Sequence, residues 1–162
     1  MIRVGHGFDA HRLVEGRRLV LGGIEIPSHV GALGHSDADV VAHAISDALL
    51  GAAALGDLGG HFPDSDPQWK DANSIVLLEA CIQRVRDAGY TLCNIDATIV
   101  VDKPKLAPYI GAMRELLATR LGVALEAVSV KAKTSEGMGY TGDGSGIAAY
   151  AVALIERDGN DW

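Results

Sequence analysis

The chain has 162 residues, 48% of them hydrophobic, and a formal net charge of −7. That length and composition predict a single compact domain over residues 1–162 with a substantial core. The acidic balance argues against nucleic acid or a membrane surface as a partner, because both favour a basic protein. The sequence contains neither a signal-peptide pattern nor an apolar run long enough to cross a bilayer, so we expect a soluble protein of the cytoplasm.

The N-terminal segment, residues 2–12, is typical of an extended strand, in which alternate side chains share a face. Asp9 and His11 therefore point the same way, and this spacing suits two ligands of one tetrahedral metal ion. Two solvated polar residues at a strand edge would give the same pattern. Residues 18–27 then predict two short strands that form a hairpin around a Gly-Gly turn.

From about residue 37 to residue 55, apolar side chains recur every three or four positions, which predicts a helix with one face in the core. Asp39 and His43 lie four apart beside that apolar stripe, so they are expected on one face, close enough to share a ligand or support one another. His35 and Ser36 precede the helix, where free backbone N–H groups favour an anion. Ordinary helix capping beside an ordinary histidine is the alternative.

The second half of the chain predicts helices and strands in alternation after a polar loop at 55–66. Helices are expected over 73–88 and from about 108 to 122, and strands over 91–102, 128–134 and 147–155. The last strand is apolar on both faces, which predicts a central strand or one covered by a partner subunit. The two cysteines, Cys81 and Cys93, lack the spacing of a disulfide framework or a thiolate zinc site and are expected to be small core residues.

A glycine-rich turn at 137–146 follows Lys133, Thr134, Ser135 and Glu136. Its five glycines in ten residues are compatible with a flexible loop, and also with backbone that lies against a phosphate group. It is not a P-loop, because no Gly-Lys-Ser/Thr ends it.

Several of these signals occur in one order along the chain: G-F-D-x-H at 7–11, G-H-S-D-x-D-x-x-x-H at 34–43, F-P-D-S-D-P at 62–67, Pro104-Lys105, and the Lys133 to Glu136 run. In this combination the chain resembles the 2-C-methyl-D-erythritol 2,4-cyclodiphosphate synthase family, zinc enzymes of the non-mevalonate isoprenoid pathway. The resemblance covers nearly the whole chain.

The resemblance implies a role for each matched position. The implied zinc ligands, with a fourth position open to a phosphate oxygen, are Asp9, His11 and His43, and Asp39 would support them. Glu136 corresponds to the ligand of a second divalent cation, Mg²⁺ or Mn²⁺, and His35 and Thr134 to the positions that stabilise the transition state. The positions implied to bind substrate are Asp9, His11, His35, Ser36, Asp57, Gly59, Phe62, Asp64, Asp66, Pro104, Lys105, Lys133, Thr134, Ser135, Glu136 and Tyr140.

The family's fold would be α+β, a two-layer sandwich in which a mainly four-stranded mixed sheet is packed on one face by helices, with a small N-terminal hairpin. The sheets would face the centre of a homotrimer, with active sites between subunits. The implied reaction is the intramolecular cyclisation of 4-diphosphocytidyl-2-C-methyl-D-erythritol 2-phosphate, a nucleotide-linked small molecule, with release of CMP by phosphorus-oxygen lyase chemistry. Two alternatives are a zinc phosphohydrolase and a non-catalytic, metal-stabilised trimeric binding protein.

One departure concerns the turn near the implied trimer axis. This chain has Asp143 and Ser145 where many members of the family carry Arg and Glu, and the arginine is associated with an isoprenoid diphosphate in a central cavity. Asp143 would repel such a ligand, so we expect this chain to bind isoprenoid diphosphates poorly there.

Overall fold

The computed structural model describes residues 1–157 and 159. Its strands are β1 (Ile2–Glu15), β2 (Leu19–Leu21), β3 (Ile24–Ile26), β4 (Val30–Leu33), β5 (Thr91–Val100), β6 (Val128–Lys133) and β7 (Gly146–Glu156). The helices are α1 (Val40–Ala52), α2 (Leu58–His61), α3 (Ser74–Asp87), α4 (Ile110–Leu121) and α5 (Gly139–Gly142), with 3₁₀ turns at Pro67–Trp69, Ala107–Tyr109 and Leu125–Ala127.

The main sheet is mixed and has five strands in the order β4-β1-β7-β5-β6, in which only the β5–β6 pair is parallel. The sheet therefore has one strand more than the four that the resemblance implied. The missing strand is β4, a four-residue segment too short to show alternation in the sequence. It joins the sheet because β1 runs on to Glu15, three residues beyond its predicted end, and residues 12–15 pair with residues 30–33.

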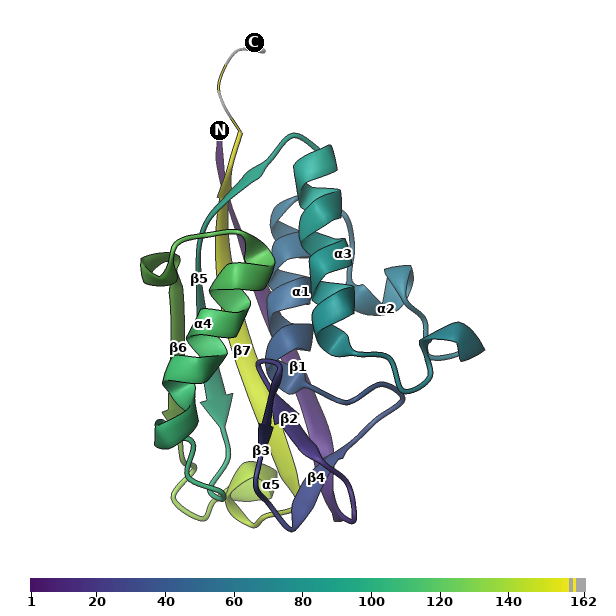
Figure 1. Ribbon diagram of the computed structural model, residues 1–162, viewed down its shortest axis with the longest axis vertical. Helices are drawn as coiled ribbons and strands as arrows, with labels where there is room; N and C mark the ends of the chain where they lie inside the picture. The colour runs from purple at the N-terminus through teal and green to yellow at the C-terminus, as the bar shows by residue number, and fades with distance from the viewer. Residues whose placement is uncertain (158, 160–162) are drawn as a thin grey trace.

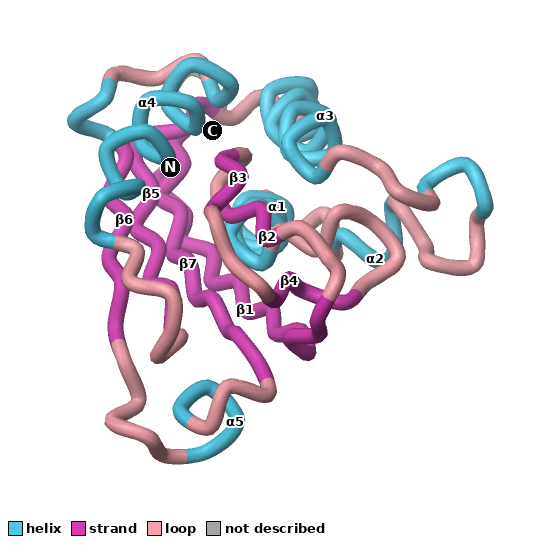
Figure 2. Tube along the Cα trace, turned by 60° about the horizontal axis from the view of Figure 1, so that its bottom comes forward, coloured by secondary structure: helices cyan, strands magenta, loops and turns pink. Residues whose placement is uncertain are grey.

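Helices α1, α3 and α4 lie together on one face of this sheet (Figures 1 and 2), as expected for a two-layer α+β fold. The closest approach is between α1 and β1, where Gly5 and Gly7 face the helix. A Cβ atom at Gly7 would lie 1.8 Å from the carbonyl oxygen of Ala44, and one at Gly5 would lie 1.9 Å from that of Ala48. The two glycines therefore let the helix backbone rest directly on the strand.

The predicted N-terminal hairpin is confirmed as the two-stranded β2–β3 sheet. Its turn residues Gly22 and Gly23 have φ angles of 57° and 79°, which is the left-handed backbone that a tight two-residue turn requires. The hairpin lies against the N-terminal end of α1 (Figure 1).

On the opposite face of the main sheet, no helix of the described residues covers the strands. It exposes the large apolar side chains Ile2, Val4, Phe8, Tyr150 and Val152, which come from β1 and β7. Strand β7 lies between β1 and β5, so the prediction of a central last strand is confirmed. Its inward side chains, such as Ala149 and Ala151, are small and buried, which is how α1 can lie close to it.

The cysteines differ from one another. Cys81 is buried in α3, as predicted, whereas Cys93 is only partly buried. The pairing of β5 with β7 is irregular between Leu92 and Asn94, so Cys93 falls outside the regular register and the core prediction is wrong for it. None of the helices in the described part of the chain combines the length and the apolar composition that crossing a bilayer requires.

Candidate metal centre and substrate cavity

Asp9, His11 and His43 meet where β1 passes the first turn of α1. Alternate residues of β1 face the helix, so the face that begins with Gly5 and Gly7 continues with Asp9 and His11. Nδ1 of His43 lies 2.9 Å from Oδ2 of Asp9, and Nε2 of His11 lies 3.0 Å from the same oxygen. One ligand atom from each residue lies within 4.8 Å of the other two. The prediction that Asp9 and His11 share one face of the strand and can bind one metal ion is thus confirmed.

A hydrogen bond orients the imidazole of His11. Nδ1 of His11 lies 2.9 Å from the carbonyl oxygen of Leu33, which can only accept, so this nitrogen carries a proton. Nε2 of His11 is therefore the nitrogen that presents a lone pair to Asp9 when the ring is neutral. It is buried, and although Asp9 lies 3.0 Å away, no residue that the structure describes meets this nitrogen with hydrogen-bond geometry. A buried nitrogen without a partner, beside a carboxylate and a second imidazole, fits a bound cation.

The charges of the three side chains are coupled. Burial raises the pKa of Asp9, but its close contacts with His11 and His43 and the charges of these rings together outweigh burial and lower the pKa to about 2. The contact with Asp9 is the main cause of the raised pKa of His11, against the opposing effect of burial. The carboxylate is thus ionised at neutral pH, which is the state that ligates a metal.

A cavity of about 380 Å³ opens beside this group. Seven of the residues implied to bind substrate line it: Asp9, His11, His35, Ser36, Gly59, Phe62 and Asp64. Nε2 of His35 is buried and without a partner in the described chain, so it is a free donor or acceptor at the cavity wall. A polar cavity beside a candidate metal group is suited to a small anionic ligand.

Two further residues of the implied substrate loop are placed differently. Asp57 caps α2, accepting the N–H of Gly60 at 2.8 Å, and Asp66 caps the turn at 67–69 by accepting the N–H of Gln68 at 3.0 Å. Neither is among the residues that line the cavity.

The expected support of the metal ligands by Asp39 is not what the structure has. Helix α1 begins at Val40, and Asp39 is its N-cap, fully buried. Its carboxylate accepts N–H groups from Gly22 and Gly23 at 2.9 and 2.8 Å and from two residues of the first helical turn. Because an N-cap residue is not on the helix surface, the four-residue spacing did not bring its side chain to that of His43.

Three residues that the sequence did not single out contact the site instead. Ser74, at the start of α3, places its Oγ 2.8 Å from Nε2 of His43, and it donates to the carboxylate of Asp37. Asp47, one turn after His43, lines the cavity and accepts the N–H of Leu58 at 2.7 Å. Burial is the main cause of the raised pKa of Asp47. The hint for Asp47 was its i+4 spacing from His43, whereas nothing local pointed to Ser74.

The remaining implied residues, from Pro104 to Tyr140, form a second group that does not line the cavity at the metal group. Most of them follow β5 and β6, and two strands separate β6 from β1, or about 14 Å at the usual spacing. Asp102 organises this group, because its carboxylate accepts the N–H groups of Ser135 and Gly137 at 2.7 and 2.9 Å. Tyr140 lines another pocket, together with His11 and Ser145.

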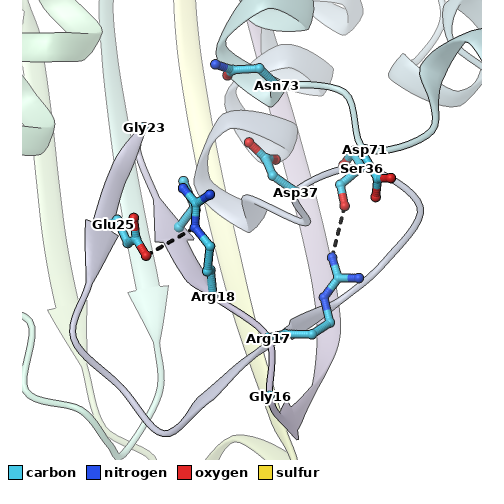
Figure 3. Close-up of a pocket in the computed structure, with 10 residues that line it drawn as sticks. Gly16, Arg17, Arg18, Gly23, Glu25, Ser36, Asp37, Asp71 and Asn73 are labelled. Atoms are coloured by element: carbon cyan, nitrogen blue, oxygen red, sulfur yellow. Dashed lines mark hydrogen bonds and ion pairs between the residues drawn. The ribbon is translucent and has the colours of Figure 1, made fainter.

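A second cavity, of about 490 Å³, lies behind Ser36 and is bounded by the hairpin and the segment 71–73 (Figure 3). Arg17 points to Ser36 and donates to its carbonyl oxygen at 3.0 Å, while Arg18 pairs with Glu25 at 3.1 Å. The Arg17 contact ties the turn that carries His35 and Ser36 to the start of the hairpin, whereas the Arg18–Glu25 pair lies within the hairpin itself.

Fold and site together define an α+β protein with a candidate metal centre, made of one carboxylate and two imidazoles, at the wall of a polar cavity. The chain matches the sequence profile of the YgbB family over residues 2–156 and belongs to that family.

The relatives carry the name that the motifs led us to expect, so the resemblance is confirmed. A curated relative from Gloeobacter violaceus, named 2-C-methyl-D-erythritol 2,4-cyclodiphosphate synthase, is 57% identical over 156 residues, which cover 96% of each chain. A solved structure of a synthase of this name in its CDP-bound form is 42% identical with a TM-score of 0.88, and the match covers 95% of this chain and 100% of that one. The bifunctional IspDF from Campylobacter jejuni is 39% identical with a TM-score of 0.94; the match covers 97% of this chain, which spans 42% of that longer protein.

Proposed function

We propose that the chain is a 2-C-methyl-D-erythritol 2,4-cyclodiphosphate synthase, acting as one domain in the cytoplasm. The observation that carries the proposal is the convergence of Asp9, His11 and His43 beside a polar cavity, in a chain 57% identical to a relative of that name. The reaction closes an eight-membered ring. An oxygen of the 2-phosphate forms a bond to the β-phosphorus, and the bond from that phosphorus to the CMP oxygen breaks, so CMP leaves with the electron pair and the enzyme is a lyase.

The residues fit a zinc ion bound by Asp9, His11 and His43. One carboxylate and two imidazoles are typical zinc donors, and three protein ligands leave one position for substrate. When bound, zinc and a second dication, Mg²⁺ or Mn²⁺ held by Glu136, would neutralise phosphate oxygens during the transfer. No protein base is required, because the attacking phosphate is already ionised near neutral pH.

The chain's own residues would bind and orient the two phosphates. His35 would offer its unpartnered Nε2 to a phosphate oxygen with Ser36 beside it, and Phe62 and Asp64, which line the same cavity, would hold the erythritol portion. In the second group, Pro104 and Lys105 would bind cytosine, and Lys133 to Glu136 with Tyr140 would bind the phosphates of the nucleotide, with Thr134 assisting the transition state.

We further propose a homotrimer with active sites between subunits. Two observations support it. The metal group and the nucleotide group lie on strands separated by two others, so a substrate that needs both is better served by groups from neighbouring subunits. The uncovered sheet face exposes Ile2, Val4, Phe8, Tyr150 and Val152, an apolar surface suited to burial against other copies.

The proposal is tested by measuring metal content and CMP release together on the purified protein. We expect zinc, and CMP formation from the cytidylated substrate, with both lost in His43→Ala while the trimer persists. Retained CMP release in that variant would overturn the metal-dependent mechanism. A wild type that releases no CMP, together with a lower melting temperature in His43→Ala, would favour a non-catalytic binding protein.

The same incubation in ¹⁸O-labelled water distinguishes cyclisation from hydrolysis. Cyclisation places no solvent oxygen in either product, because the nucleophile belongs to the substrate. A zinc phosphohydrolase would instead place one labelled oxygen in a product for each CMP released.

A further inference from the structure

Nε2 of His43 contacts the buried residue Ser74, which is hydrogen-bonded to the half-buried residue Asp37, and neither of the two lines the cavity at the metal group. Ser74 is completely buried at the first position of α3, and its Oγ lies 2.8 Å from Nε2 of His43. The Ser74 hydroxyl donates to Oδ1 of Asp37, and the backbone N–H of Ser74 donates to Oδ2 of the same carboxylate at 3.1 Å. The order of contacts is therefore Asp37, Ser74, His43, with Asp9 on the far side of the ring.

The direction of these hydrogen bonds fixes the protonated nitrogen of His43. A hydroxyl has one proton, and at Ser74 it is directed to a carboxylate that can only accept. The Ser74 oxygen is thus an acceptor toward His43, so Nε2 must carry a proton and donate it. Ser36 is farther away, at 3.2 Å from the same nitrogen, so Ser74 is the nearer acceptor of this proton. Nδ1 faces the Asp9 carboxylate at 2.9 Å, and it is the nitrogen that would offer a lone pair to a cation bound in place of the proton between them.

The backbone holds Asp37 apart from Asp39 by an uncommon conformation. Ala38, which separates them, has φ of 58°, a left-handed value that costs a non-glycine residue about 1 kcal/mol. This turn sends the Asp39 carboxylate to the hairpin and the Asp37 carboxylate to α3. Two backbone bonds fasten the turn to the segment before α3, from Asp71 to the carbonyl of His35 at 2.8 Å and from Asp37 to that of Ala72 at 3.1 Å.

We infer that Asp37 and Ser74 are positioning residues that hold His43 as the Nε2–H tautomer with Nδ1 directed at the metal. The inference deepens the proposed function, because it rests on zinc binding by Asp9, His11 and His43. Neither residue needs to touch substrate. Partners of this kind orient metal-ligating imidazoles, and removing them weakens metal binding by about 10- to 100-fold.

Asp37→Asn separates positioning from packing, because the two side chains have nearly the same shape. The Ser74 backbone N–H needs an acceptor, so the amide oxygen of Asn takes that place and its NH₂ faces the Ser74 hydroxyl. Ser74 then accepts from Asn and turns its own proton to Nε2 of His43, which favours the tautomer with the proton on Nδ1. If Asp37 served packing alone, the zinc dissociation constant of this variant would equal that of the wild type.

The experiment measures the zinc dissociation constant of the full chain by competition with a chromophoric chelator. We expect Ser74→Ala and Asp37→Asn each to weaken zinc binding by at least about 10-fold. The controls are Ser46→Ala, which removes another completely buried serine hydroxyl that donates to the Ala42 carbonyl in α1, and Asp87→Asn on the surface. Both controls should bind zinc as the wild type does.

A spectroscopic readout accompanies the titration. In the zinc-loaded wild type, the Nε2 proton of His43 should be visible by ¹H–¹⁵N NMR and protected from solvent exchange, and Ser74→Ala should increase its exchange rate at least 10-fold. Zinc affinity within twofold of the wild type in Asp37→Asn, or an unprotected Nε2 proton in the wild type, would overturn the inference. A wild type that binds no zinc would instead overturn the proposed metal centre itself, so the two failures are distinguishable.

Discussion

The carboxylate of Asp39 accepts the backbone N–H of Gly22 at 2.9 Å, which joins the turn of the β2–β3 hairpin to the first turn of α1. Asp39 is fully buried and accepts three more N–H groups, so one side chain serves both the hairpin and the helix. The hairpin therefore lies where it does because of a residue that looks, in the sequence, like a neighbour of the metal ligands.

Replacing Asp39 by Ala should lower the free energy of unfolding by at least about 3 kcal/mol, because it removes an N-cap and leaves buried N–H groups without acceptors. Chemical denaturation of the metal-free protein measures this loss. Asp57→Ala is the matched control, since it removes an exposed N-cap with one hydrogen bond and should cost less than about 1 kcal/mol. Equal losses in the two variants would contradict the structural role of Asp39.

Gly7→Ala should displace α1 from β1, because the new Cβ would lie 1.8 Å from the Ala44 carbonyl oxygen. We expect a loss of stability of about 3 kcal/mol or more, together with weaker zinc binding, since Asp9 and His43 lie on the two elements that are forced apart. Gly111→Ala is the control: nothing lies within 4 Å of its added Cβ in α4, so it should stabilise the protein by about 0.5–1 kcal/mol. Unaltered zinc affinity in Gly7→Ala would show that the site tolerates such a shift.

The stability of the metal-free protein should depend on pH through Asp9 and His11. The folded pKa of Asp9 is lowered to about 2 from 3.8, so its contribution, of about 2 kcal/mol, is present above pH 4 and is lost as the pH falls toward 2. The folded pKa of His11 is raised above 6.5, so its contribution is complete below that value and is lost as the pH rises through the folded pKa. Urea unfolding of the metal-free wild type should therefore be most difficult between about pH 4 and 6.5. In Asp9→Asn both dependences should be reduced, and an unchanged profile would contradict the coupling.

Removing the metal with a chelator should lower the melting temperature, and adding zinc should restore it. Free zinc at 100 times its dissociation constant would stabilise the folded state by about 2.7 kcal/mol, because it binds the assembled ligands and not the unfolded chain. Differential scanning fluorimetry at several zinc concentrations measures the effect. His43→Ala should show no zinc-dependent shift, and a shift of wild-type size in that variant would indicate that zinc binds elsewhere.

Phe62→Ala should loosen the loop that walls the cavity. The ring is 7% exposed, its centroid lies 4.9 Å from that of Trp69, and the Arg84 guanidinium lies 4.9 Å above it. We expect a KM for the cytidylated substrate raised about 10-fold with a smaller change in kcat, because binding is lost while the metal group on β1 and α1 stays in place. Val76→Ala, at an exposed position of α3, should leave both constants unchanged. A kcat loss without a KM change would place Phe62 in the chemical step instead.

Much of the fold was predictable because the elements that form it repeat over many residues. The alternation in residues 2–12, the apolar run at 147–155 and the helical spacing after residue 37 persist long enough to define two strands and a helix. Strand β4 was not predictable, since four residues carry no period and its place depends on the free edge of β1. The bulge that displaces Cys93 was not predictable either, because it depends on the register in which β5 pairs with β7.

By itself, the sequence determined which chemical groups the site can offer, a carboxylate and two imidazoles, because the spacing along β1 puts Asp9 and His11 on one face and His43 lies beside the apolar stripe of α1. Only the tertiary structure decided what each neighbour does. Asp39 caps a helix and holds a hairpin, while Ser74, 31 residues from His43, supplies the contact that Asp39 was expected to make. Spacing gives the direction of a side chain within one element, whereas its partner on another element depends on how the two elements pack.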